Sequence, residues 1–426
     1  MKKGFLSLVL GICMITGLAG CGEKKNIPEP AYDIDNEEEE YTWQEPVIQG
    51  DASVLRTGVN AFAYEMYDHL EAGEDLFFSP YSLCTALSLL NVGAGSDTKA
   101  ELEEMLGIED MGTWNAAMRV YLNAEWPKET FVLTANSVWL QTGYEWAPNI
   151  ETEFLQPAGY YYMSEMYEVD FDNEPQDAVD KMNAWADENT RGMIPEIMKK
   201  IPDDTVLALM NAVYFEGKWA EPFLEDKTRE RTFYGTDGEK QVEMMHQYGE
   251  SYAYVEMDGM KGISLPYKDA NVVMKIFIPL EDGTDIETLF NALSIEEKEA
   301  LLDSLDTAGR ETMDSLVIPK FSMEKEITGL NGILQDMGME AAFLPDADLD
   351  VIGEDLYVTD VLHKAKIEVD EEGTTAAAVT VIITADTCAM PVEEPKNFIA
   401  DRPFVYVLQD TETGMILFMG RVNNLE

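Results

Sequence analysis

The chain has 426 residues, 46% of them hydrophobic, which is enough apolar material for one large buried core or for two or three domains. Lys and Arg total 29 against 82 Asp and Glu, so the formal net charge is -53. Because such a charge repels nucleic-acid phosphates and anionic lipid headgroups, the composition argues against a nucleic-acid partner.

The first 20 residues have the features of a signal peptide. Lys2 and Lys3 precede an apolar run at 5–18, which is shorter than the ~20 residues that a membrane-spanning helix needs. The run ends in Leu-Ala-Gly-Cys at 18–21, which resembles the lipobox of bacterial lipoproteins. We therefore expect 1–20 to be a lipoprotein signal peptide and Cys21 to carry lipid. An ordinary secretory signal with a cysteine there by chance is the alternative.

Residues 21–52 are expected to form a flexible acidic linker. They contain four successive glutamates at 37–40, three prolines and few aliphatic residues, so they cannot bury enough apolar surface to fold. Their like charges should extend the segment and lift the following domain off the membrane. The expected location is the cell surface, anchored by lipid to the outer face of a bacterial membrane, or the extracellular medium after release.

From 53 to 426 the composition stays uniform, without a second linker or an internal repeat, which predicts one domain. Its first half is rich in helix signals. Residues 59–70 are amphipathic, and the helix expected at 81–90 follows Ser79 and Pro80, a capping residue and a proline at the first helical position. Residues 177–190 place their apolar side chains on one stripe at helical spacing.

The second half is rich in strand signals. Short runs of β-branched and aromatic residues are separated by turn residues. With one run from the first half, the predicted strands cover 131–140, 263–267, 272–279, 315–321, 356–362, 404–409 and 415–422. Helices and strands do not alternate regularly, so the fold class is α+β rather than a doubly wound α/β sheet.

No enzyme motif is present. The three histidines, His69, His246 and His363, lie outside any metal-binding pattern, and there is no nucleophile elbow, phosphate-binding loop or dinucleotide fingerprint. His363 follows a predicted strand, where a hydrogen-bonded core histidine is a simpler interpretation than a general base. Outside the signal and lipidation segment only Cys84 and Cys388 remain, too far apart along the chain to predict a disulfide or a metal site. We expect no catalytic activity, no metal and no cofactor.

Six groups of short motifs follow one another along the domain. They are FSPYS at 78–82, NAW at 183–185 with TRGMI at 190–194, NAVYFEGKW at 211–219, IPKF at 318–321, DVLHKA at 360–365 leading to EEGTTAAA at 371–378, and ADRPF at 400–404. In this order they resemble the serpin family of serine protease inhibitors over 53–422. Three positions depart from the family pattern: Glu216 stands in place of Lys, Lys366 in place of an apolar residue, and Thr375 in place of Glu.

The resemblance implies a single serpin domain at 53–426, in which a helix-rich first half packs on large, mostly antiparallel sheets. It also implies an exposed reactive-centre loop at about 371–400. The hinge of that loop corresponds to Glu371, Glu372, Gly373, Thr374, Thr375, Ala376, Ala377 and Ala378. The cluster where the family's central sheet opens corresponds to Ser79, Ser82, Asn211 and His363, with Trp219 at the top of the opening.

The hinge and the residues after it suit a strand that is buried on one face, since alternate side chains of a strand point inward. If Thr374 faces inward, the further inward positions are Ala376, Ala378, Thr380, Ile382 and Thr384. None of them is proline or charged. Proline would remove a hydrogen-bond donor from the ladder, and a charged side chain would cost several kcal/mol on burial. The bulky, charged or proline hinge residues typical of non-inhibitory serpins are absent. An ordinary alanine-rich loop beside a strand is the alternative.

The family's spacing from Gly373 places the primary specificity residue at Thr387, and spacing from the other end of the loop favours Cys388 or Ala389. No Arg, Lys, Phe, Tyr or Trp occurs between 373 and 395. Small side chains there fit the shallow pocket of elastase-like proteases, and subtilisin-like proteases are the next candidates. Cys388 is alternatively a redox-active or metal-reactive thiol.

We therefore predict a monomeric inhibitor that traps a serine protease covalently after cleavage and loop insertion. Its expected partners are elastase-like or subtilisin-like proteases and, through lipid on Cys21, a membrane. The alternatives are a non-inhibitory surface-binding or transport protein on the same scaffold and, less favoured by the missing nucleophile motif, a hydrolase.

Overall fold

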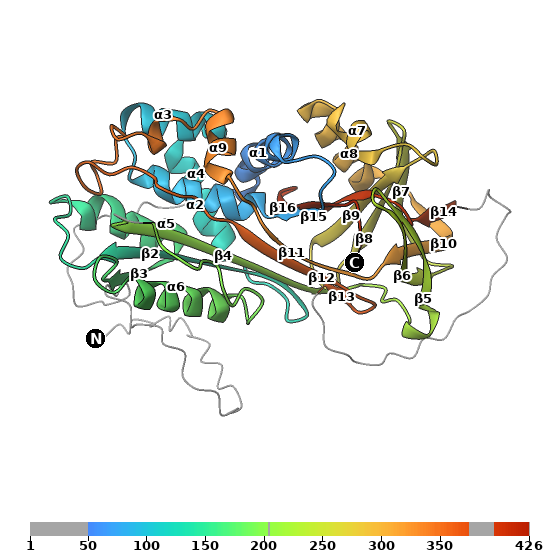
Figure 1. Ribbon diagram of the computed structural model, residues 1–426. Helices are drawn as coiled ribbons and strands as arrows, with labels where there is room; N and C mark the ends of the chain where they lie inside the picture. The colour runs from blue at the N-terminus through green and yellow to red at the C-terminus, as the bar shows by residue number, and fades with distance from the viewer. Residues whose placement is uncertain (1–49, 203–204, 375–395, 426) are drawn as a thin grey trace, which may run out of the picture.

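The computed structural model describes residues 50–202, 205–374 and 396–425. Within these ranges a six-stranded sheet lies between two helical layers: α2 packs on one face of it and α6 on the other (Figure 1). A second, larger sheet system stands at the far end of the molecule from α3 and α5. The predicted α+β class and the mostly antiparallel sheets are confirmed.

The structure describes nine α-helices within these ranges. They are α1 (Leu55–His69), α2 (Pro80–Val92), α3 (Ser96–Met105), α4 (Met111–Leu122), α5 (Gln156–Tyr162), α6 (Pro175–Asn189), α7 (Ile286–Asn291), α8 (Ile295–Thr307) and α9 (Leu330–Asp336). Short helical turns of other kinds occur at Ala52–Val54, Glu151–Leu155, Glu225–Lys227 and Ala341–Phe343.

The six-stranded sheet has the order β11-β12-β13-β4-β2-β3. Its members are β11 (Phe321–Glu326), β12 (Lys364–Val369), β13 (Gly373–Thr374), β4 (Leu207–Lys218), β2 (Thr130–Gln141) and β3 (Ser164–Val169). Among the adjacent strands of this sheet, only β2 and β3 are parallel. Because its strands come from distant parts of the chain, residues far apart in the sequence meet across it.

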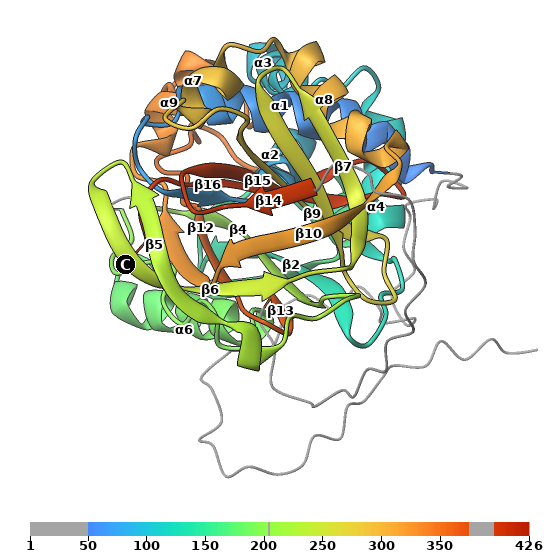
Figure 2. The same cartoon turned by 90° about the vertical axis from the view of Figure 1, so that its right-hand side faces the viewer.

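The second sheet system has the order β1-β16-β15-β9-β8-β7-β10-β6-β5, with β14 pairing in parallel with β10 (Figure 2). Its strands are β1 (Leu76–Phe78), β5 (Arg229–Gly235), β6 (Gly238–Gln247), β7 (Ser251–Met257), β8 (Met260–Pro266), β9 (Val272–Pro279), β10 (Arg310–Pro319), β14 (Lys396–Ile399), β15 (Phe404–Asp410) and β16 (Ile416–Val422).

The sequence located α1, α2 and α6, with small errors at their ends. Ser79 caps α2 by accepting a hydrogen bond from the Ser82 amide at 3.0 Å, and Pro80 occupies the first helical position, where its missing N–H is not needed. Nearly every side chain of α2 is buried, because the helix is enclosed by β4, β16 and neighbouring helices. This helix fixes the position of the polar residues described below.

The strand predictions are most accurate where the neighbouring strands of the sheet are themselves regular. The strand predicted at 272–279 matches β9 residue for residue. The segment predicted at 315–321 is the end of β10 and the start of β11, since the ladder is interrupted at Lys320.

The predicted strand at 356–362 is wrong: these residues form no ladder. Two of their backbone amides are satisfied elsewhere, since the Val358 amide donates to the Ala342 carbonyl at 2.8 Å and the Val361 amide donates to Asn331 Oδ1 at 2.8 Å. The segment lies across a cavity from the edge of β4, too far for strand pairing.

The predicted signal peptide at 1–20, Cys21 and nearly all of the predicted linker at 21–52 lie outside the described residues. Over the ranges that are described, no helix combines the length and the apolar character needed to cross a bilayer.

Candidate functional site

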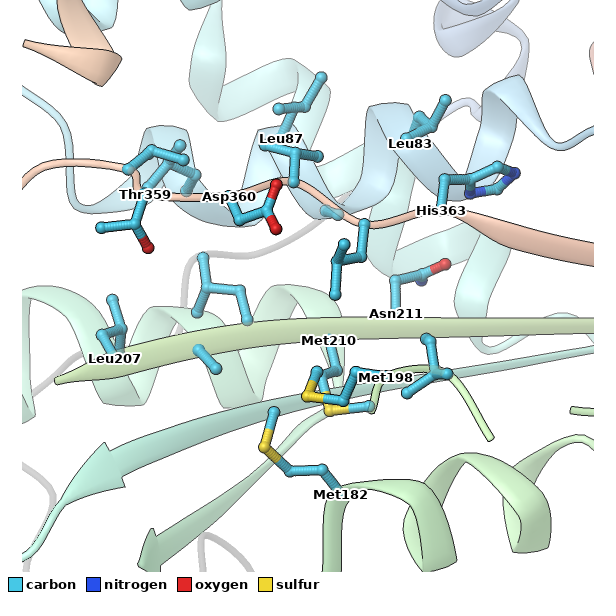
Figure 3. A pocket seen from close by; sticks show the side chains of 18 of the residues that line it. Leu83, Leu87, Met182, Met198, Leu207, Met210, Asn211, Thr359, Asp360 and His363 are labelled. Carbon is cyan, nitrogen blue, oxygen red and sulfur yellow. The ribbon is translucent and has the colours of Figure 1, made fainter. Parts of the chain in front are cut away.

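The six-stranded sheet is interrupted between β12 and β4. The two-residue strand β13 is antiparallel to both, pairing Thr374 with Val369 on one side and with Gly217 on the other. Beyond this point the edge of β4 from residue 216 to residue 207 has no ladder partner within the described parts of the chain. The space beside it is a cavity of about 350 Å³, bounded by α2, α6, β4 and residues 355–365 (Figure 3).

A buried polar cluster stands at the middle of this opening. The Ser79 amide donates to His363 Nε2 at 3.0 Å, and Ser79 Oγ donates to the Leu417 carbonyl at 2.7 Å. Ser82 Oγ donates to Asn211 Oδ1, and Asn211 Nδ2 in turn donates to Asn136 Oδ1 at 2.7 Å. The structure thus brings together four of the predicted residues, from α2 and its N-cap, from β4 and from the position before β12, although they are up to 284 positions apart.

Burial sets the protonation state of His363. The ring is 6% exposed, and its removal from water lowers the pKa to about 4. Because Nε2 accepts a hydrogen bond from an amide, the ring is neutral in the folded protein near pH 7. The cluster is therefore uncharged where the sheet is interrupted.

This shift predicts a pH dependence of stability. The unfolded chain, with an ordinary pKa near 6.5, binds a proton that folded His363 rejects until about pH 4. The free energy of unfolding should therefore fall as the pH drops from 6.5 to 4, by about 3 kcal/mol. Urea unfolding across this range measures it. In His363→Gln, which retains an acceptor, this part of the slope should vanish, and an unchanged slope would refute the assignment.

The hinge strand β13 is held from both sides. Thr374 is 2% exposed, and its Oγ1 lies 2.6 Å from the hydroxyl of Tyr267. A Cβ atom on Gly373 would lie 2.0 Å from the carbonyl oxygen of Gly217, so only glycine permits this close approach of the two backbones. The side chain of Thr374 thus faces the core, which is the condition under which the alternate positions from Ala376 to Thr384 would also face inward.

Glu371 fixes the turn that leads into the hinge. It is 6% exposed, accepts a hydrogen bond from Thr228 Oγ1 at 2.6 Å, and forms an ion pair with Lys320 at 2.9 Å. Burial alone would raise the pKa of Glu371, but the hydrogen bonds from Thr228 and Lys320 outweigh it and hold the pKa below its ordinary value. The carboxylate is therefore ionised, and it ties the hinge to the start of β5 and to the β10–β11 junction.

Trp219 lies at the hinge end of the opening rather than in the polar cluster. Its ring stacks on Tyr267 at 4.6 Å, its amide donates to the Glu372 carbonyl at 2.8 Å, and Nε1 donates to the Asp370 carbonyl at 2.9 Å. Trp219 and Tyr267 together support the chain on both sides of Gly373.

Two of the departures from the family pattern are accommodated by ion pairs. Glu216 accepts a hydrogen bond from the Tyr214 hydroxyl at 3.0 Å and lies 3.4 Å from Arg191. Lys366, on β12, pairs with Glu368 at 2.8 Å. Both side chains lie on the outer face of the sheet, where charge is tolerated.

Sequence reasoning missed Tyr267, Thr228, Lys320 and Asn136 as parts of the site. Lys320 belongs to the IPKF motif at 318–321, but nothing in the spacing of Tyr267 or Asn136 indicated a contact with the hinge or the cluster. The hinge residues Thr375, Ala376, Ala377 and Ala378 and the candidate cleavage residues Thr387, Cys388 and Ala389 lie outside the described part. In the part that is described, no group of three or more His, Cys, Asp or Glu side chains is placed to hold a metal ion.

The fold and the hinge define a protein whose central sheet has an opening one strand wide. The model of the family described as "Serpin (serine protease inhibitor)" matches residues 57–425. A serpin-like protein of Thermococcus kodakarensis is 35% identical, with 100% of this chain and 99% of the relative covered. Leukocyte elastase inhibitor of Bos taurus is 32% identical over 85% of this chain and 97% of its own.

Solved structures agree with the sequence comparisons. The native state of tengpin, a thermophilic serpin, superposes with a TM-score of 0.79 at 27% identity and covers 93% of this chain and 100% of its own. The chain belongs to the serpin family, so the fold expected from the sequence motifs is confirmed.

Proposed function

We propose that this protein traps serine proteases covalently, by inserting its own cleaved loop into the opening between β12 and β4. The observation that carries the proposal is β13: two residues of the hinge already form a strand antiparallel to both neighbours. A chain that continued in the same direction would lie between two strand edges and pair with both of them. Insertion would then complete an interrupted sheet.

Extending the register of β13 gives the partners of each inserted residue. Thr374 lies opposite Gly217 and Val369, so Ala376 would lie opposite Phe215 and Ile367. The same count places Thr384 opposite Leu207, where β4 begins. The uncharged, proline-free run at 375–384 therefore has the length of the free edge of β4 from residue 216 to residue 207.

The register also accounts for the polar cluster. Thr380 would lie opposite Asn211 and His363, with its side chain on the same face as that of Thr374. A hydroxyl at that level has polar partners, whereas the inward neighbours Ala378 and Ile382 are apolar. We infer that Ser79, Ser82, Asn211 and His363 keep the sheet satisfied with or without the additional strand.

The covalent step follows the ordinary chemistry of the target enzyme. The protease serine oxygen attacks the carbonyl carbon of the scissile peptide, the C–N bond breaks, and the leaving nitrogen takes up the proton, which leaves an acyl ester. Insertion of 375–384 would carry that ester toward the far end of β4 before water reaches it. The protein's part is mechanical, so no catalytic residue is needed in its own chain.

The proposed targets are elastase-like proteases, then subtilisin-like ones, with cleavage after Thr387, Cys388 or Ala389. The name of one relative, leukocyte elastase inhibitor, supports the first class. Incubation with elastase should give a complex that survives boiling in detergent, and the released C-terminal peptide should begin at Cys388, Ala389 or Met390 by mass spectrometry. Efficient trapping of trypsin but not of elastase would overturn the assignment.

Binding of a ligand by a non-inhibitory protein on the same scaffold is the competing function. The loop of such a protein would be cleaved by the same proteases without forming a detergent-stable complex. Denaturing gel electrophoresis after incubation with elastase therefore distinguishes the two functions.

We further propose that lipid on Cys21 anchors a monomer to the outer face of a bacterial membrane, with the acidic segment at 21–52 as spacer. The lipobox-like sequence and the charged, proline-containing composition support this. Cys21→Ser should release the protein from the membrane fraction, and membrane retention of that variant would contradict the anchor.

A further inference from the structure

We propose that the cavity between β4 and residues 355–363 binds an amphipathic organic cation, with its ammonium group at Asp360 and its apolar chain between α2 and α6. The bound cation would exclude the inserting loop and so regulate inhibition. The regulatory part rests on the proposed function, whereas the binding site itself does not.

The walls of the cavity suit an apolar chain. Leu83 and Leu87 from α2 line one side, and Met182 from α6 and Met198 from the α6–β4 connection line the other (Figure 3). Because the sheet is interrupted here, the space extends from one helical layer to the other. Its volume of about 350 Å³ is sufficient for a small organic ligand, and thioether side chains adapt their shape to one.

Asp360 gives the cavity a negative mouth. Figure 3 shows its carboxylate turned into the space between the segment and β4. Partial removal from water and, less strongly, the charge of Glu326 raise the pKa of Asp360, although a hydrogen bond from the Val361 amide opposes the shift. No ion pair joins Asp360 to a cationic side chain within the described ranges. Lys364, which also lines the cavity, is held by Glu324 at 2.7 Å and by the Glu196 carbonyl at 2.9 Å. An ammonium group is therefore the complement that the site lacks.

Ligand and inserted strand would compete for the same place. The register of β13 puts residues 378–384 along β4 from Val213 to Leu207, and all seven residues of that stretch of β4 also line the cavity. Occupancy should therefore slow insertion and divert cleaved molecules toward release of active protease.

Binding is tested with decyltrimethylammonium below its micelle concentration, measured by calorimetry on the intact protein. The net charge of -53 attracts any cation, so tetramethylammonium serves as a probe of the head group alone and decanoate as a probe with an apolar chain and the opposite charge. We expect one site for decyltrimethylammonium, weakened by about tenfold in Asp360→Asn but unchanged in Asp350→Asn, an exposed position outside the cavity. Equal affinity of both variants, or equal binding of decanoate, would overturn the site.

Regulation is tested on the same samples. Saturating decyltrimethylammonium should raise the stoichiometry of protease inhibition, and loop-cleaved protein should lose the site. If the cation binds as described but cleavage leaves both its affinity and the melting temperature unchanged, the insertion mechanism fails while the binding site stands. If cleavage raises the melting temperature and the cation never bound, only the ligand site fails.

Discussion

Ala376→Arg should convert the inhibitor into a substrate. The register of β13 places this position opposite Phe215 and Ile367, which are 6% and 1% exposed, on the face that packs against the core. Burial of an unpaired guanidinium there costs on the order of 3 kcal/mol or more, which slows insertion by at least ~100-fold. Protease should then hydrolyse the acyl ester first. The stoichiometry of inhibition should rise at least ~10-fold, as titration of residual protease activity would measure.

Thr375→Arg is the matched control. One residue earlier, the side chain would point to the opposite face, between Glu216 and Glu368, which are half-buried carboxylates. The same added charge should therefore leave the stoichiometry almost unchanged. Equal loss of inhibition in both variants would show that charge alone, not inward burial, causes the effect.

Cleavage of the loop within residues 386–391 should raise the melting temperature by about 10 °C or more. An additional ten-residue strand would bury its inward side chains and complete two ladders, which is worth on the order of 10 kcal/mol. Because the entropy of unfolding is about 2 cal/mol/K per residue, each kcal/mol raises the melting temperature of a domain of this size by about 1.3 °C. Limited digestion with a metalloprotease, which forms no acyl ester, followed by calorimetry measures the change.

Ala376→Arg again supplies the control, since its cleaved form should gain much less stability than cleaved Thr375→Arg. A melting temperature that cleavage leaves unchanged in the unmodified sequence would favour the non-inhibitory alternative.

Local signals in the sequence were sufficient for much of the fold. Ser79 and Pro80 predict the start of α2, because helix capping and the preference for proline at the first helical position depend only on neighbouring residues. The alternation at 272–279 predicts β9 because both of its partners, β8 and β15, are regular strands. The motifs then assigned the cluster residues, which local patterns alone would not have connected.

Contacts between segments far apart in the chain could not be predicted from such local signals. Residues 356–362 have strand-like composition, yet a strand needs a partner, and the facing edge of β4 is separated from them by the cavity. Tyr267 contacts Thr374 across 107 positions, and the position of Asp360 at the cavity depends on the interruption of the sheet. Such contacts follow from the whole fold rather than from any segment.

Hydrogen–deuterium exchange before and after loop cleavage tests the central claim most directly. In the intact protein, the amides of β4 from residue 208 to residue 216 that do not donate to β2 should exchange readily, because that edge lacks a strand partner. After cleavage, these amides and those of residues 375–384 should become strongly protected together, as a continuous ladder requires. Identical exchange along this edge before and after cleavage would contradict insertion between β12 and β4.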